Sequence, residues 1–281
     1  MPMPRRFPTS LAAFVVLWLG VPEPVHAQDP APALSAAEME AFLLDAELTD
    51  VRDVGTGVTG SRRATASDGR LTHDVHIQSV DISRSRFVAR GARVELNFRD
   101  SYLYNVAAYR LAVLLGIDNV PMSVLRGVDG RRAAVTWWVD DVAMTEAERI
   151  EQRTLGPDPA RTSRQFYTQY VFDELIQNRD RNQGNMLWTT DWKMWLIDHT
   201  RAFRQDVELT KPERLLRIER GLLDNLRGLT PEALDAALGD VLSRGERSSV
   251  MRRRDLLLQH FDERIARFGE RGVVIDPEPA R

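Results

Sequence analysis

Alternating hydrophobic and polar positions fill much of the first half of the chain, whereas helical periodicity fills the second half. A helix is predicted over Ala36–Asp45, where Ser35 and Glu38 have the spacing of a capping box. Short alternating runs then predict strands at Leu48–Val54, Ser61–Ser67, Leu71–Val80, Met122–Val128 and Arg132–Val139. Asp68-Gly69 and Asp129-Gly130 are typical turns between paired strands. The first half is therefore expected to form an antiparallel sheet.

One helix interrupts these strands, and several more follow them. Asp100 is expected to cap a helix that runs to Leu115 and ends at Gly116. The Arg-rich segment 81–99 before it has no clear period. Four later helices are predicted at Arg161–Gln177, Pro212–Leu226, Pro231–Leu242 and Ser249–Phe268. The pattern predicts an α+β protein with a β-rich part over 35–141 and a helical part over 142–281.

Three polar residues lie where the helical part is interrupted. Asp180 follows the helix at Arg161–Gln177 in a polar loop, and Asn185 begins a short apolar run. Asp198 ends a second apolar run, so a hairpin between the two runs would bring Asn185 and Asp198 together. Phosphoryl transfer needs one carboxylate to orient and deprotonate the attacking hydroxyl, and an amide oxygen and a second carboxylate to hold Mg²⁺. The alternative is a polar hairpin whose Asp and Asn residues only form turns.

The spacing of these three residues resembles that of the catalytic and metal-binding residues of protein kinases. The loop Asn178-Arg179-Asp180-Arg181-Asn182-Gln183-Gly184-Asn185 is similar to that of atypical kinases of the phosphatidylinositol 3/4-kinase superfamily. HipA-type kinases and secretory-pathway casein kinases have a similar loop. Their second metal-binding motif is similar to Ile197-Asp198-His199-Thr200-Arg201-Ala202-Phe203. Asn182 stands in place of the usual His, and Thr200 in place of the usual Gly. The resemblance implies a two-lobed kinase-like fold with Asp180 as catalytic residue and Asn185 and Asp198 as ligands of Mg²⁺ or Mn²⁺.

The resemblance also indicates where ATP or another nucleotide would bind. Gly57, Thr59 and Gly60 lie between two predicted strands, where a glycine-rich turn lets backbone N–H groups approach phosphates. The strand Ala134–Val139 would lead into an interlobe hinge at Asp140-Asp141. Trp138 and Val139 would then meet an adenine ring.

A lysine is missing from the expected phosphate site. The chain has two lysines, Lys193 and Lys211, and neither lies in the β-rich part. The strand Val75-His76-Ile77-Gln78 places Gln78 where kinases have the lysine, and Asn105 stands where its glutamate partner is expected. Arginine is also a phosphate ligand. The candidates for the missing cation are Arg62, Arg63, Arg86, Arg90, Arg93 and Arg99, and Glu95 is an alternative carboxylate.

The N-terminal residues have the features of a secretory signal. Arg5 and Arg6 precede a short apolar core, and Val25-His26-Ala27 fits a cleavage site, so residues 1–27 are expected to be removed. Residues 28–34 then form a Pro/Ala linker. The remaining chain has no long apolar run and no cysteine, so we expect neither a transmembrane segment nor disulfides in the mature protein. A periplasmic or secreted location follows.

Composition excludes some partners and leaves others open. The formal net charge of −3 does not favour nucleic-acid binding. The expected activity is phosphoryl transfer to the hydroxyl of a protein, a lipid or a small molecule. Three alternatives remain at this stage: a pseudokinase that serves as a binding module, nucleotidyl transfer by the same fold, and a scaffold with a metal-stabilised hairpin.

Overall fold

The computed structural model describes residues 34–54, 60–88 and 94–277, and Ser35 onward belongs to one compact unit. The expected helix α1 (Ala36–Asp45) is present, with Ser35 and Glu38 in a complete capping box. The predicted signal segment 1–27 lies outside the described residues and stays a prediction. No described helix has the length and apolar character needed to cross a membrane.

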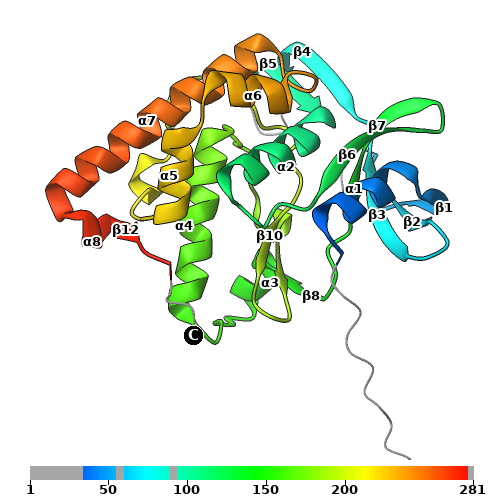
Figure 1. Cartoon of the computed structure of the whole chain (residues 1–281), viewed down its shortest axis with the longest axis horizontal. Coiled ribbons are helices and arrows are strands. Elements are labelled where there is room, and N and C mark those ends of the chain that lie inside the picture. The colour runs from blue at the N-terminus through cyan, green and yellow to red at the C-terminus, as the bar shows by residue number, and fades with distance from the viewer. Residues whose placement is uncertain (1–33, 55–59, 89–93, 278–281) are drawn as a thin grey trace, which may run out of the picture. The chain divides into compact units, whose positions relative to one another are not determined.

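The predicted antiparallel sheet is confirmed. Its five strands run in the order β1-β2-β3-β7-β6. Their bounds are β1 (Glu47–Asp53), β2 (Arg62–Ser67), β3 (Thr72–Gln78), β6 (Ser123–Val128) and β7 (Arg131–Trp137). The turn at Asp129-Gly130 has positive φ angles of 51° and 73°, which is why Gly follows Asp there. Figure 1 shows these strands and α1 on the opposite side from the long helix α7.

The unassigned segment 81–99 forms most of a second hairpin. Strand β4 (Asp81–Val88) pairs with β5 (Val94–Ser101), and helix α2 (Leu103–Leu115) follows. The prediction that Asp100 caps this helix is wrong. Asp100 lies in β5, Tyr102 is the N-cap residue without a side-chain bond, and the Asp100 carboxylate accepts a hydrogen bond from Arg201 instead. Gly116 ends α2 with a φ of 68°, as predicted.

The predicted central hairpin is present and has an additional strand. Strand β9 (Met186–Thr189) pairs with β10 (Met194–Leu196), and β8 (Val142–Thr145) adds to its other edge. The helices before the hairpin are α3 (Glu146–Glu151) and α4 (Pro159–Leu175), and the short 3₁₀ helix η1 (Gln183–Asn185) leads into it. Strand β8 has only four residues, which is too short for a recognisable alternation.

The last third is helical, with one correction. The predicted helix Pro212–Leu226 is wrong in its first half, which contains the 3₁₀ helix η2 (Pro212–Arg214) and strand β11 (Ile218–Glu219). Strand β11 pairs in parallel with β12 (Val274–Ile275), a contact between distant segments that local periodicity cannot reveal. The helices are α5 (Arg220–Gly228), α6 (Pro231–Leu238), α7 (Arg244–Phe268) and α8 (Glu270–Val273). Helix α7 begins five residues earlier than Ser249 because Ser243 and Glu246 form a capping box.

Two hydrophobic clusters support this arrangement. The smaller one joins α1 to one face of the five-stranded sheet through residues such as Leu43, Val75 and Ile77. The larger one contains residues of α2, α4, α5, α6, α7 and the central hairpin. Helix α4 packs against α7 in this larger cluster (Figure 1), so the loop that follows α4 starts from a rigid support.

Candidate functional site

A cavity of about 380 Å³ lies where the five-stranded sheet meets the central hairpin. Strands β3 and β7 line it from the sheet, and the hairpin lines it with Leu187 and Leu196. Most of the surface that lines the cavity is apolar, which suits the binding of a flat aromatic ring. The polar lining residues are Ser61, His76, Asn105, Ser123, Thr136, Asn185, Asp198 and His199.

The segment after β7 forms one wall of this cavity. Trp138 and Val139, which the sequence assigns to nucleotide binding, both line it. The Trp138 N–H is already bonded to the carbonyl of Asp74 at 3.2 Å. Next to it, the Nε2 of His73 lies 2.7 Å from Asp140, and the His73 ring stacks on Trp137 with 3.8 Å between ring centroids. These contacts hold the hinge segment against β3.

Asn185 and Asp198 line the same cavity, as the hairpin model requires. Strand pairing aligns their flanks: Met186 lies opposite Leu196, and the Ile197 N–H donates to the Asn185 carbonyl at 3.1 Å. Asp198 has a φ of 54°, a left-handed conformation that Asp tolerates better than most residues.

Thr200, two residues after Asp198, fixes the Asp198 carboxylate. The Thr200 hydroxyl donates to Asp198 Oδ1 at 2.9 Å, so the residue that departs from the usual glycine orients the Asp198 carboxylate. Asp198 is exposed, and the hydrogen bonds that its carboxylate accepts from the described residues both come from Thr200 and both reach Oδ1. The other oxygen faces no hydrogen-bond donor among the described residues.

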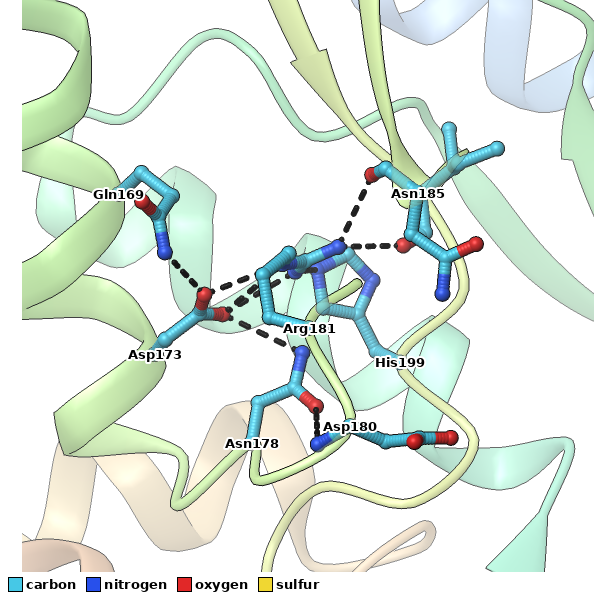
Figure 2. A network of polar contacts seen from close by, with 8 residues as sticks. Gln169, Asp173, Asn178, Asp180, Arg181, Asn185 and His199 are labelled. Atoms are coloured by element: carbon cyan, nitrogen blue, oxygen red, sulfur yellow. Dashed lines mark hydrogen bonds and ion pairs between the residues drawn. The ribbon is translucent and has the colours of Figure 1, made fainter. Parts of the chain in front are cut away.

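Asp180 lies in the loop after α4, and its side chain is 52% exposed. The side chain of Asn178 accepts a hydrogen bond from the Asp180 N–H at 3.2 Å, which shapes the start of the loop. Figure 2 shows the Asp180 carboxylate turned away from the buried polar network around Arg181. It forms an ion pair with Arg201 at 3.0 Å. Asp180 is not among the residues that line the cavity, and its carboxylate is partly open to solvent.

Arg181 ties the Asp180 loop to the β9–β10 hairpin (Figure 2). Its guanidinium forms an ion pair with Asp173 on α4 at 3.0 Å and is only 6% exposed. Its Nη1 donates to the carbonyl oxygens of Asn185 at 3.1 Å and Ile197 at 2.6 Å. Its Nη2 contacts the Nε2 of His199 at 2.9 Å. One buried side chain therefore sets the positions of the segments that carry Asp180, Asn185 and Asp198.

His199 completes this network as a neutral ring. Burial and then the nearby Arg181 charge hold the pKa of His199 well below its usual value. Because a guanidinium only donates, the neutral Nε2 accepts from Arg181. The His199 backbone N–H donates to Asn105 Oδ1 at 2.8 Å. Asn105 thus connects α2 to the hairpin, and it also lines the cavity.

Gln78 has a different environment from Asn105. Its side chain is 2% exposed and does not line the cavity. Its Nε2 donates to Ser61 Oγ at 3.1 Å, and its Oε1 accepts from the Ser79 and Val80 N–H groups. A phosphate contact by Gln78 stays a prediction. In the same strand, His76 lines the cavity, and burial lowers its pKa although the Asp198 charge opposes that shift.

The glycine-rich turn is only partly described. Gly57 and Thr59 lie outside the described residues, so their predicted phosphate contacts stay predictions. Gly60 has a φ of 63°, which favours glycine, and its neighbour Ser61 lines the cavity. The turn therefore leads into the cavity wall at its described end.

The donor set of the cavity fits Mg²⁺ or Mn²⁺. Mg²⁺ commonly takes one or two protein oxygen ligands and completes its shell with waters and substrate phosphates. Asn185 and Asp198 supply an amide oxygen and a carboxylate to one cavity, and the Asn185 side chain has no hydrogen-bond partner among the described residues. No group of three His, Cys, Asp or Glu residues in the described ranges is placed to bind a metal. An ion here would therefore depend on ligand oxygens.

A second, more polar cavity of about 1280 Å³ adjoins the other side of the Asp180 loop. It is lined by α3, α4, loop residues that include Arg179, and the segment from Arg204 to Arg214. Several of its charges are paired: Arg149 with Glu146, Arg181 with Asp173, and Arg179 with Asp206 and Glu208. The loop thus separates an apolar cavity from a polar one.

Sequence reasoning did not identify Arg201, Asp100 or Asp173 as part of the site. Asp100 comes from β5 and reaches Arg201 across about a hundred positions, a relation without any local pattern. Arg201, in contrast, lies three residues after Asp198, and that proximity in sequence could have indicated it.

Comparison with known proteins identifies the fold. No protein-family model matches the chain, and no curated protein sequence matches it. A hydra Fam20 structure determined with sugar has a TM-score of 0.66 at 14% identity, with 86% of this chain and 93% of that chain covered. The Golgi casein kinase has a TM-score of 0.61 at 13% identity, covering 86% and 80%. The Helicobacter pylori proinflammatory kinase CtkA has a TM-score of 0.50 at 10% identity, covering 80% and 98%. The α+β kinase-like fold is therefore confirmed.

Proposed function

We propose that this protein is a metal-dependent phosphotransferase of the atypical kinase type, which transfers the terminal phosphoryl group of a nucleotide to a hydroxyl. The main support is that Asn185 and Asp198 line one nucleotide-sized cavity while Arg181 holds the Asp180 loop beside it. The proposal includes a closer relation to phosphatidylinositol 3/4-kinases and HipA-type kinases, which rests on the loop residues around Asp180. It also includes export by the signal segment 1–27.

The proposal gives each of these residues a role. The apolar walls and the hinge residues Trp138 and Val139 would hold the base of ATP or another nucleotide. Asn185 and Asp198 would hold Mg²⁺ or Mn²⁺, which neutralises phosphate charge and fixes its orientation. Asp180 would orient the acceptor hydroxyl and accept its proton. The polar cavity beyond the loop would admit the acceptor, which can be a protein, a lipid or a small molecule.

The metal role predicts how an Asp198→Asn variant responds to nucleotide. In the wild type, ATP at 100 times its dissociation constant with Mg²⁺ should add about 2.7 kcal/mol of stability, seen as a higher unfolding temperature. We expect the Mg²⁺-dependent part of this shift to disappear in Asp198→Asn. Asp191→Asn, which alters an exposed carboxylate on the hairpin turn, is the matched control. An unchanged Mg²⁺-dependent shift in Asp198→Asn would contradict the metal role.

The cavity assignment predicts the effect of filling the cavity. Leu187 lines the cavity from β9, so the larger side chain of Leu187→Trp would occupy the space expected for the base. We expect this variant to lose nucleotide-induced stabilisation and to remain folded, with a cost of about 1–3 kcal/mol from overpacking. Thermal unfolding with and without nucleotide measures both effects. A variant that still binds ATP as the wild type does would place the base elsewhere.

One observation favours a second candidate, a pseudokinase that binds a ligand without transferring phosphate. The described lining of the cavity contains the Asp198 carboxylate and no Lys or Arg. Mass spectrometry of products formed with ATP separates the candidates. Gain of a phosphate supports phosphotransfer, gain of a nucleotide indicates nucleotidyl transfer, and ATP binding without any product supports the pseudokinase.

A further inference from the structure

The nucleotide cavity has an unfavourable charge for the ligand proposed. A nucleoside triphosphate is a polyanion, and the charged residue in the described lining is the carboxylate of Asp198. A bound metal ion offsets part of this repulsion, and kinases add a lysine for the rest. Lys193 is paired with Asp118, and Lys211 lines the second cavity. An arginine must therefore supply any protein cation at the phosphates.

The arginines that the sequence offered as candidates do not reach the cavity where the structure describes their side chains. Three of them form ion pairs with carboxylates: Arg62 with Asp129, Arg63 with Asp74, and Arg99 with Glu246. Arg86 is exposed on the β4–β5 hairpin, and none of these four lines the cavity. Arg90 and Arg93 lie outside the described residues.

Arg201 lies outside the described lining of the cavity, but it is a cation that the fold brings to Asp180. Its Nε donates to Asp100 at 3.1 Å, and its Nη1 donates to Asp180 at 3.0 Å. Burial lowers the pKa of Arg201, but the hydrogen bond with Asp100 and the charges of Asp180, Asp100 and Asp198 outweigh it and raise that pKa. Its side chain is 28% exposed, so part of the guanidinium remains accessible.

The two partners of Arg201 differ in a way that suits phosphate binding. Asp100 is 1% exposed and fixes the Nε side of the guanidinium from β5. Asp180 is exposed and belongs to the catalytic loop. The Nη2 group of Arg201 has no hydrogen bond among the described residues. A planar guanidinium fixed on one side can direct its outer N–H groups at two phosphate oxygens.

We propose that Arg201 binds the transferred phosphoryl group and so replaces the lysine that the β-rich part lacks. This inference rests on the proposed phosphotransferase function. In the reaction, the acceptor oxygen forms a bond to the terminal phosphorus, and the bond from that phosphorus to the bridging oxygen breaks. The nucleoside diphosphate leaves with that electron pair, and the acceptor proton passes to Asp180. Arg201 stays protonated and stabilises the charge on the equatorial phosphate oxygens.

The test compares Arg201→Gln with the wild type in Mg²⁺, using ATP, ADP and adenosine as probes and calorimetry to measure dissociation constants. GTP, GDP and guanosine form a second probe set. Loss of one charge-assisted contact should weaken triphosphate binding about tenfold or more. Nucleoside affinity should stay within about twofold, because the base site is unchanged. Arg201→Lys should recover part of the triphosphate affinity because lysine keeps the positive charge. The recovery should be incomplete because lysine cannot bind two phosphate oxygens in the way that a planar guanidinium does.

Asp100 provides the control for a purely structural effect. Arg201→Gln leaves the buried Asp100 carboxylate without its cation, so the double variant Asp100→Asn/Arg201→Gln removes both charges. We expect the double variant to lose triphosphate affinity as Arg201→Gln does, because both variants lack the guanidinium. Equal losses for triphosphate and nucleoside, or an unchanged triphosphate affinity in both Arg201→Gln variants, would overturn the role of Arg201. A wild type that binds neither probe set would overturn the proposed function together with this inference.

Discussion

Asp180→Asn should abolish most phosphoryl transfer and leave nucleotide binding intact. The amide keeps the size of the side chain and its contact with Arg201, but it cannot accept the proton of the acceptor hydroxyl. Loss of a positioned general base costs roughly 10²–10⁴-fold in turnover. The measurement is the rate at which labelled phosphate moves from ATP to the acceptor or, without an acceptor, to water. Thermal unfolding with ATP and Mg²⁺ then reports binding separately.

The control for Asp180→Asn is another exposed carboxylate that pairs with a cation. Asp118 is exposed and pairs with Lys193 away from the catalytic loop, so Asp118→Asn should turn over as the wild type does. Wild-type turnover in Asp180→Asn would refute the assignment of Asp180 as the base. Simultaneous loss of turnover and nucleotide binding would instead show that Asp180 shapes the site.

The second large effect is expected for the stability of an Arg181→Met variant. Methionine fills a similar volume but leaves Asp173 as a buried carboxylate without its ion-pair partner. Breaking a buried ion pair by removing one partner typically costs about 3–5 kcal/mol. The carbonyl oxygens of Asn185 and Ile197 also lose their Arg181 donor, so the hairpin loses its connection to the loop. Urea unfolding of the two proteins measures the difference in free energy.

Removing the unpaired charge of Asp173 as well should restore much of the lost free energy of unfolding. Gln169 and Asn178 donate to different oxygens of Asp173 in the native protein. In Arg181→Met/Asp173→Asn, the amide oxygen can keep the bond from Asn178, and the new NH2 group can donate to Gln169 once the Gln169 amide turns over. We expect the double variant to lie within about 2 kcal/mol of the wild type. If the double variant is as unstable as Arg181→Met, the carbonyl contacts rather than the ion pair account for the stability.

Local signals predicted much of the secondary structure. The helix after Ser35, the strands of the five-stranded sheet and the end of α2 at Gly116 follow from caps, alternation and turn residues, which act over a few positions. The errors fall where distant contacts override those signals. Part of the predicted helix Pro212–Leu226 forms β11 instead, because Ile218 pairs with Val274.

For the site, the sequence alone placed Asn185 and Asp198 on one hairpin and Asp180 in the loop before it. This worked because a hairpin of two short apolar runs brings its ends together, whatever the rest of the chain does. The absence of a lysine from the β-rich part likewise follows directly from the sequence. These inferences needed only neighbouring residues and the resemblance of the loop to kinases.

Only the tertiary structure showed which groups support these residues. Arg181 joins α4 to the hairpin through Asp173 and two carbonyl oxygens, and Arg201 joins β5 to the loop after α4 through Asp100 and Asp180. Asp100 had the local signature of a helix cap, yet it lies in a strand and binds a residue far along the chain. The energy of a buried ion pair depends on which distant elements exclude water from it, and no short stretch of sequence specifies that.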